Sequence, residues 1–407
     1  MADRREELWS RLRDAGIPGV PDEFSVTFAH QAVPAALLAE IDGFIRVFED
    51  VTTRPVWQEN VIRSSGQDVP LGRPEVCFFS AWDFHLPPDG PWQVIEFNDN
   101  GSGLLYAGLI NESFHALMEP ASKAALEPPP PAAELEKRIT QMVRREAEGF
   151  FGVMPEGLFL ILDEPEALER GKFGGEMEML RELFREEGWP AAVASTAEIR
   201  WDGERLWRGG EPVSFIVNRS TDFLLEKEAT RPLREAFLNG GVYVAPNPFT
   251  YATRSDKRLL EFLSLPTWDR ELGIEAHERA VLSRHIPETR LLRPESLDAI
   301  AGDKDRFVFK PMRSHASRGF LPSARVGRSR LQRLVRRGED YVAQRKVGRP
   351  RIELGRDSFV WADLRVWAYR GERVLLSGRT SVDPDSLDLR PPAGWLPTFA
   401  AVGPAGS

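Results

Sequence analysis

Four consecutive prolines, Pro128–Pro131, constrain the folding of this chain more than any other local feature. Proline has no backbone N–H group, cannot continue a helix and favours extended backbone. We therefore expect a linker that begins at Glu127. A chain of 407 residues is long enough for two or three structural units at roughly 100–200 residues each. The linker therefore predicts that the first unit comprises residues 1–126.

The charge of the chain excludes one large class of functions. It has 53 basic and 62 acidic residues, a formal net charge of −9. A general nucleic-acid binder needs a basic surface that displaces counterions from phosphates, so we expect no nucleic-acid partner.

No apolar run of about 18 residues occurs, and the charged first residues have no apolar segment behind them. We therefore expect no membrane partner and no secretory signal. The single cysteine, Cys77, cannot form an internal disulfide or a cysteine metal cage. These features are typical of a cytoplasmic protein, and they leave a homodimer open.

The middle of the chain predicts a parallel α/β unit. Leu158–Asp163 is a short apolar run, an amphipathic helix covers about 175–187, and Ala191–Ala194 is a second short strand. This strand–helix–strand order is typical of a right-handed crossover between parallel strands.

The last third predicts antiparallel sheet. Strands are expected at 306–311, 341–344, 364–369 and 373–379, and Arg370–Glu372 forms the turn of a hairpin. The fold class expected is therefore α+β with an α/β part. We expect three units: 1–126, a helical region with two strands; 127–245, an α/β domain; and 246–407, a part with antiparallel strands and helices.

Glu96 and Asn98 lie two residues apart in an expected strand, so their side chains point to one face. Asp83 on the preceding strand adds a third oxygen across the ladder. Mg²⁺ prefers oxygen ligands and takes few of them from protein, so these residues are a candidate metal site. The alternative is that residues 98–101 are only a polar turn.

Three segments carry groups that suit a nucleotide. Lys310 ends an apolar strand, and the small polar loop 313–319 follows; a lysine and loop N–H groups bind phosphate oxygens. Gln344 also ends a strand, where it would lie at an adenine edge. Ser255 or Asp256 would cap a helix whose first turn carries Lys257. A cation there conflicts with the helix dipole unless an anion binds.

Each of these segments also has an ordinary structural interpretation, as a solvated lysine or a plain strand end. Asp363 and Arg365 share one face of a strand and would form an ion pair, while Arg379 on the neighbouring strand would hold a phosphate or carboxylate. A structural salt bridge is the alternative for this group as well.

Together these motifs resemble the ATP-grasp superfamily, in the circularly permuted form of the synthetase domain of glutathionylspermidine synthase. The similarity covers roughly 73–115 and 245–385. The motifs in chain order are Trp82-Asp83-Phe84, Glu96-Phe97-Asn98, Ser255-Asp256-Lys257, Lys310-Pro311, Ser317-Arg318-Gly319 and Gln344. The resemblance implies an ATP-grasp fold, with antiparallel sheets and helices beside a parallel α/β unit.

The resemblance also implies roles for single residues and a dependence on ATP and Mg²⁺. The implied Mg²⁺ ligands are Asp83, Glu96 and Asn98. The implied nucleotide-binding residues are Lys257, Lys310, Gln344 and, in a flexible lid, Ser317 and Gly319. Arg365 and Arg379 resemble arginines that face the phosphate or acyl-phosphate.

The chain departs from the family pattern in two places. The lid has less glycine than usual, and the segment after Arg379 lacks the Asn that many relatives use for metal. If metal binds there, Asp383, Asp385 or Asp388 would have to serve. No amidase domain is visible, and residues 120–240 match no motif.

The activity that the resemblance implies is an ATP-dependent ligase that joins a small-molecule carboxylate to an amine through an acyl-phosphate. Arg219 and Asp222 are candidates for substrate contacts. Two alternatives stay open: phosphoryl transfer to a hydroxyl on the same fold, and a nucleotide-binding module without turnover.

Overall fold

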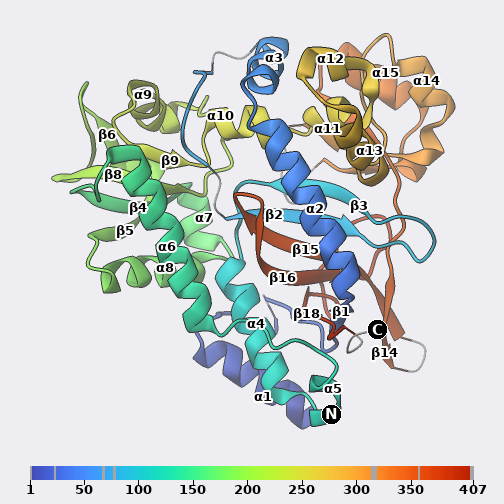
Figure 1. Cartoon of the computed structure of the whole chain (residues 1–407), viewed down its shortest axis with the longest axis horizontal. Helices are drawn as coiled ribbons and strands as arrows, with labels where there is room; N and C mark the ends of the chain where they lie inside the picture. Colours follow the sequence, from blue (N-terminus) through green and yellow to red (C-terminus); the bar gives the residue numbers. More distant parts are fainter. Residues whose placement is uncertain are drawn as a thin grey trace.

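The structure is a computed structural model, and it describes residues 2–22, 24–66, 69–76, 79–312, 319–355 and 358–403. Figure 1 shows a central sheet with a green lobe on one side and an orange lobe on the other. Each lobe contains a sheet of its own.

The central sheet combines the two ends of the chain. Its strand order is β17-β16-β15-β2-β3, and β14 pairs with β15. The first hundred residues supply β2 and β3, whereas the other strands follow residue 350. The strands are β2 (Ser80–His85), β3 (Gln93–Asn98), β14 (Arg351–Gly355), β15 (Ser358–Tyr369), β16 (Glu372–Ser381) and β17 (Trp395–Leu396).

The two faces of the central sheet pack against different helices. Trp82, Phe84 and Leu364 pack on the long helix α2 (Ala35–Thr52), which crosses in front of the sheet in Figure 1. On the other face, Ala81 and Trp367 pack against helix α4 (Leu104–Leu117). Side chains alternate between the faces of a strand, so the polar residues between these apolar ones point to the side of α4.

The green lobe is the expected parallel unit. Its order is β5-β4-β8-β7-β6, with β9 beside β8, and β4 is parallel to both of its neighbours. The run Leu158–Leu162 is apolar throughout because helices cover both faces of a parallel sheet. The strands are β4 (Leu158–Asp163), β5 (Ala191–Ser195), β6 (Ile199–Trp201), β7 (Leu206–Arg208), β8 (Glu211–Asn218) and β9 (Tyr243–Ala245).

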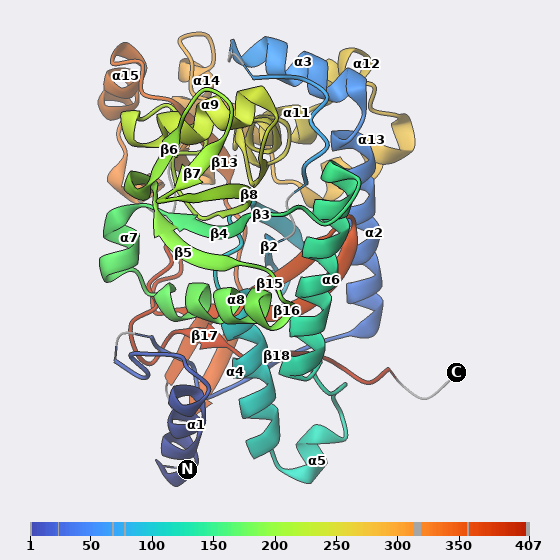
Figure 2. The ribbon, with the colours of Figure 1, turned by 90° about the vertical axis from the view of Figure 1, so that its left-hand side faces the viewer.

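Helices of this lobe cover the two faces of its sheet, as Figure 2 shows from the side. One core joins Phe159 and Ile161 to α6 and α8, and a second core joins Leu160 and Leu162 to α9. The helices are α6 (Ala132–Phe151), α7 (Pro165–Arg170), α8 (Gly174–Glu186), α9 (Arg231–Asn239) and α10 (Pro248–Thr250).

The orange lobe holds a small antiparallel sheet in the order β10-β13-β11-β12. Its core packs this sheet against two short helices, with Phe309, Leu331 and Ala343 fully buried. The elements are β10 (Thr289–Leu291), α14 (Leu297–Gly302), β11 (Phe307–Pro311), β12 (Leu321–Pro322), α15 (Arg328–Arg336) and β13 (Tyr341–Arg345).

The remaining elements connect these parts. Strand β1 pairs with β18 in parallel, so the N-terminal region also contacts the end of the chain. In the described residues, no helix combines the length and apolarity that a membrane crossing requires. These elements are α1 (Ala2–Asp14), β1 (Gln31–Val33), α3 (Pro55–Ser65), α5 (Pro120–Lys123), α11 (Leu259–Ser264), α12 (Asp269–Leu272), α13 (Ala276–His285) and β18 (Thr398–Ala400).

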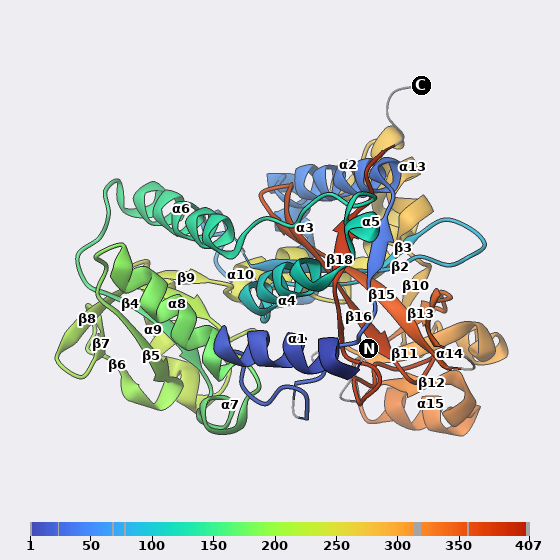
Figure 3. The same cartoon turned by 90° about the horizontal axis from the view of Figure 1, so that it is seen from below.

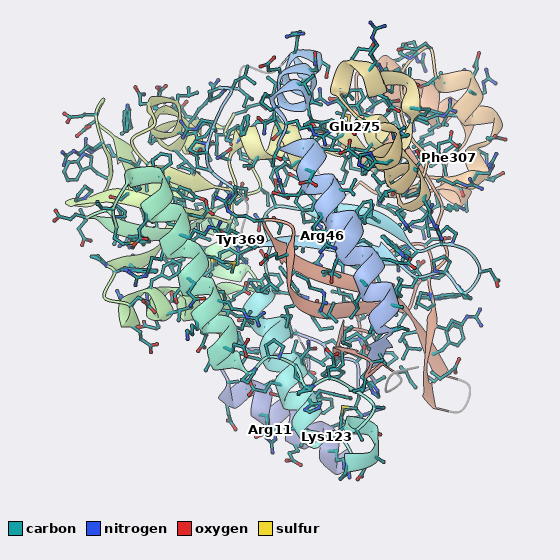
Figure 4. All side chains as sticks on the ribbon, viewed as in Figure 1. Arg11, Arg46, Lys123, Glu275, Phe307 and Tyr369 are labelled. Atoms are coloured by element: carbon teal, nitrogen blue, oxygen red, sulfur yellow. The ribbon has the colours of Figure 1, made fainter. Side chains whose placement is uncertain are left out.

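The parallel lobe is fastened to the central sheet by a polar contact. Tyr369, labelled in Figure 4 at the end of β15, donates a hydrogen bond to the buried Glu146 on α6. Arg370 also donates to Glu146, at 2.8 Å. Figure 3 shows from below that the central sheet lies between the two lobes.

The strands expected at 158–163, 191–194, 306–311, 341–344, 364–369 and 373–379 are confirmed, including the turn at Arg370 and Gly371, where both residues have positive φ. The expected α+β class with a parallel α/β part is confirmed as well. The division at residues 126 and 245 stays a prediction. Residues 80–98 lie in the same sheet as residues 351–396.

The buried Asn111 on α4 generates a prediction about stability. Its amide donates to the carbonyls of Leu376 and Thr398 at 2.8 and 3.2 Å and accepts from the Thr398 N–H group at 3.1 Å. Asn111→Ala leaves these buried groups unpaired and should lower the free energy of unfolding by about 3 kcal/mol. Urea unfolding measures this, and the exposed Asn239→Ala is the control; equal midpoints for both variants would contradict it.

Candidate active site

A cavity of about 1060 Å³ lies where the three sheets meet. It is lined from the central sheet, from the ends of β4 and β8 in the parallel lobe, and from β11 and β13 in the orange lobe. Eight of the site residues expected from the sequence line it. These residues are Asp83, Glu96, Asn98, Lys257, Lys310, Gln344, Arg365 and Arg379.

A buried ion-pair network covers the floor of this cavity. Asp83, which is 2% exposed, accepts from Arg365 at 2.7 and 2.8 Å, in the fork geometry that suits a guanidinium. Arg379 Nη2 lies 2.9 Å from Asp83 Oδ2 and 2.7 Å from Asp363 Oδ2. One network therefore links β2, β15 and β16.

The expected ion pair between Asp363 and Arg365 is wrong. Asp363 lies opposite Arg379 in the register of β15 and β16, and Arg365 lies opposite Asp83 in the register of β15 and β2. Directly opposite residues of antiparallel strands come closer than residues two apart in one strand. The pairs therefore form between strands.

Both sides of this network stay charged. Burial alone would raise the pKa of Asp83, but Arg365 and Arg379 outweigh it and hold that pKa at about 2. Burial disfavours the charged form of Arg379 too, yet Asp363 and Asp83 raise its pKa above the usual range. The floor of the cavity thus keeps fixed charges at neutral pH.

The three expected metal ligands lie side by side. Glu96 on β3 is the register partner of Asp83 on β2, and Asn98 Nδ2 donates to Asp83 Oδ2 at 3.3 Å. Lys257 Nζ lies 3.0 Å from Glu96 Oε1. Burial would raise the pKa of Glu96, but Lys257 and Lys310 lower it below the usual value.

This donor set fits Mg²⁺ bound together with phosphate. Mg²⁺ is usually held by one or two carboxylates, with phosphate oxygens and water completing the octahedron. Glu96, Asp83 and the Asn98 amide supply that number of oxygens. Within the described ranges, no group of three or more His, Cys, Asp or Glu side chains could hold a metal by itself.

Lys310 and Gln344 form the wall of the cavity on the orange lobe. Lys310 Nζ donates to Gln344 Oε1 at 2.7 Å and to the Ile95 carbonyl at 3.2 Å, which also joins β11 to the central sheet. Burial lowers the pKa of Lys310 to about 8, although Glu96 partly opposes this effect. A buried cation of this kind is stabilised by an anionic ligand.

Of the two expected caps, Asp256 does cap the turn that carries Lys257, because its Oδ1 accepts a hydrogen bond of 2.9 Å from the Arg258 N–H group, but Lys257 does not lie in the first turn of the helix. Residues Tyr251–Ser255 form a π-helical turn, and α11 begins only at Leu259, after Lys257. The Ser255 hydroxyl instead donates to Asp99 Oδ2 at 2.6 Å. Lys257 therefore reaches Glu96 from an irregular turn, and no helix dipole opposes its charge.

Only the last residue of the predicted lid, Gly319, lies among the described residues. Residues 313–318, which include the predicted Ser317, lie outside the described residues. Gly319 is described, has φ +74° and is fastened by a hydrogen bond of 3.1 Å from the Tyr341 hydroxyl to its carbonyl. Its neighbour Phe320, and not Gly319 itself, lines the cavity.

The alternative metal ligands differ in position. Asp385 lines the cavity, whereas Asp383 accepts hydrogen bonds from the backbone of Asp385 and Ser386. Asp388 pairs with the exposed Arg390. These contacts order the 383–390 turn.

Of the two candidate substrate residues, Arg219 lines the cavity and Asp222 does not. The carboxylate of Asp222 accepts hydrogen bonds from the N–H groups of Glu226 and Lys227 and from the Thr230 hydroxyl. It therefore shapes the loop after β8, and we do not retain it as a substrate residue.

Among the lining residues that sequence reasoning missed are His85, Arg349 and Asp163. Arg349 Nε donates to His85 Nε2 at 3.0 Å, and burial together with Arg349 lowers the pKa of His85 to about 3. Arg349 adds another cation near the network. Only Asp163 carried a visible signal, because it ends the apolar run of β4.

Comparison with known proteins shows the fold alone. No protein-family model matches the sequence, and no curated protein matches it. Among solved structures, the chain is similar to a glutathione synthetase-like effector from Globodera pallida in its apo form, with a TM-score of 0.52 and 9% identity over 98% of this chain and 96% of that chain.

Two further solved structures are more distant. A protein assigned as a gamma-glutamylcysteine synthetase from Methylobacillus flagellatus KT gives a TM-score of 0.46 and 12% identity, covering 92% of this chain and 90% of that chain. The ATP-grasp ligase PsnB, complexed with minimal precursor, gives 0.33 and 11%, covering 62% and 92%. The expected ATP-grasp fold class is confirmed, while the circularly permuted subtype stays a prediction.

The buried pair of Asp83 and Arg365 generates a second prediction. Arg365→Gln leaves Asp83 with an uncompensated buried charge and should cost about 3–5 kcal/mol of stability. The same change at Arg208, whose pair with Glu198 is partly exposed, should cost less than about 1 kcal/mol. Urea unfolding compares the two variants, and a small effect at Arg365 would show that the network is not structural.

Proposed function

We propose that the chain is an ATP- and Mg²⁺-dependent ligase that joins a carboxylate to an amine through an acyl-phosphate intermediate. One observation carries this proposal: cations and oxygen donors from segments hundreds of residues apart line a single cavity. The similarity in fold to the glutathione synthetase-like effector also supports the proposal.

The charges of the cavity favour a phosphate ligand. On the side of the central sheet and the orange lobe, the lining cations outnumber the lining carboxylates, and an excess of positive charge attracts anions. The cations are Lys257, Lys310, Arg345, Lys346, Arg349, Arg365 and Arg379, and the carboxylates are Asp83, Glu96, Asp99, Asp363 and Asp385.

In the proposed reaction, Lys257 and Lys310 bind the phosphates of ATP, and Gln344 orients Lys310 through its amide oxygen. Glu96, Asn98 and Asp83 would hold Mg²⁺, which neutralises phosphate charge when it is bound. Arg365 and Arg379, fixed by Asp83 and Asp363, supply positive charge where the transferred group becomes more negative.

The bond changes involve the substrates alone. A carboxylate oxygen of the acid attacks the γ-phosphorus, ADP leaves, and the acyl-phosphate forms. The amine then attacks the acyl carbon, phosphate leaves, and the amine nitrogen loses its proton. An amide, ADP and phosphate are the products, whereas a phosphomonoester would identify the alternative phosphotransferase.

The substrates can be identified by their effect on the thermal stability of the protein. A bound ligand raises the stability of the folded chain by RT ln(1 + [L]/Kd). We expect a thermal-shift screen with Mg-ATP to show an increase in Tm, and a further increase with the correct acid. No shift with Mg-ATP would contradict a nucleotide site.

Glu96→Gln and Asn98→Ala should each lower turnover by at least about 100-fold, because each removes an oxygen ligand of the proposed Mg²⁺ site. Both variants should also lose the Mg²⁺ dependence of ATP binding, measured by calorimetry with and without EDTA. The exposed Glu353→Gln on β14 is the matched control. Normal activity in both site variants would remove the metal assignment.

Lys310→Ala should raise the Kd for ATP by about 10- to 100-fold, because it removes a charge-assisted hydrogen bond to phosphate. Calorimetry measures the affinity. Lys304→Ala, which removes a lysine paired with the exposed Asp305, is the control. ATP affinity like that of the parent would show that Lys310 has a structural role only.

A further inference from the structure

The cavity has a second end, in the parallel lobe, that the proposed nucleotide site does not use. Asp163 ends β4 and Arg219 follows β8, and both line the cavity. The two strands are parallel neighbours, with Leu162 opposite Asn218. Ligands of open parallel α/β sheets bind outside the carboxyl ends of the strands, which is the position of these two residues.

The carboxylate of Asp163 is only partly used by the fold. Asp163 Oδ1 accepts a hydrogen bond of 2.7 Å from the Glu164 N–H group. In the described part of the chain, no ion pair to Asp163 is formed. Burial raises the pKa of Asp163 to about 6, although the Glu164 N–H group and Arg219 partly oppose this effect.

Arg219, the cation at the end of the neighbouring strand, is paired with another carboxylate. Arg219 Nη2 binds Glu176 Oε2 at 2.8 Å, and the two side chains are 3% and 1% exposed. Glu176 also accepts hydrogen bonds from the N–H groups of Gly103 and Leu105 at 2.7 and 3.0 Å. Arg219 and Glu176 thus neutralise each other, and Asp163 stays without an ion pair in the described part of the chain, although Arg170 and Lys172 line the same cavity.

The adjacent carboxylate is different. Glu164 accepts hydrogen bonds from Lys227 at 2.7 Å, from the Thr221 hydroxyl at 3.0 Å and from the Ser220 hydroxyl at 3.3 Å. These contacts stabilise the loop after β8, so Glu164 has a structural role that explains its place. Asp163 has no comparable role.

The two ends of the cavity are in contact. The side chain of Asn100, two residues after Asn98, donates a hydrogen bond to the Arg219 carbonyl. The residue beside Asp163 is therefore bound directly to the turn that follows the proposed metal ligands. A small molecule held at Asp163 lies in the same cavity as the proposed phosphate site.

We propose that Asp163 binds the ammonium group of the amine substrate, so that the substrate class is a primary amine that is protonated at neutral pH. This inference rests on the proposed ligase function. An ammonium supplies the missing countercharge and forms a charge-assisted hydrogen bond with the carboxylate.

The test uses the full chain, Mg-ATP, the acid found in the thermal-shift screen, and glycine, ethanolamine and 1,3-diaminopropane as amines. Asp163→Asn should raise the KM for the accepted amine by about tenfold or more, and leave the KM for ATP unchanged. Glu166→Gln, which removes an exposed charge at the same cavity, is the matched control. Asp163→Ser, which keeps an acceptor for the Glu164 N–H group, replaces Asp163→Asn if that variant does not fold.

Hydroxylamine separates this inference from the proposed function. It is mostly uncharged at neutral pH and traps an acyl-phosphate as a hydroxamate without needing an ammonium site. Hydroxamate formation by the parent and by Asp163→Asn at equal rates, with the amine KM raised, supports the inference. An unchanged amine KM, or equal loss of hydroxamate, overturns it. No hydroxamate and no amide from the parent would overturn the proposed function itself.

Discussion

The paired charges of Asp83 and Arg365 determine how the rest of the cavity is built. They join strands β2 and β15, whose residues are 282 positions apart in the sequence, and both side chains are almost fully buried. A shift of one residue in the register would turn Asp83 to the opposite, apolar face. The pair therefore selects one register, and that register places Glu96 and Asn98 beside the lysines of the other segments.

Local sequence patterns predicted most strands and helices correctly, but they did not predict which residues on different strands form ion pairs. The alternation in residues 92–98 placed Glu96 and Asn98 on one face, and the apolar run of β4 predicted a buried parallel strand. The partners of Arg365 and Arg379 depend on which strands become neighbours, which no local pattern contains. Lys257 was expected in the first turn of a helix, but α11 begins at Leu259; Asp256 caps the turn before it, and Ser255 contacts Asp99 instead.

The cavity separates its charges along its length. Cations outnumber carboxylates where the central sheet meets β11 and β13, and Asp163, which forms no ion pair in the described residues, lies at the end of β4. An anion and a cation can therefore bind in one cavity without competing for the same groups. The short link from Asn100 to Arg219 keeps the two ends together, since it connects the central sheet to the parallel lobe.

The central sheet also sets an order of events during synthesis. The hairpin of β2 and β3 leaves the ribosome long before β15, since Arg365, the partner of Asp83, lies 282 residues later in the sequence. In that interval the cluster that contains Trp82 and Phe84 still lacks Leu364 and Val366 of β15. The nascent chain thus carries an unpaired strand edge, which is a surface that chaperones bind and that aggregation exploits.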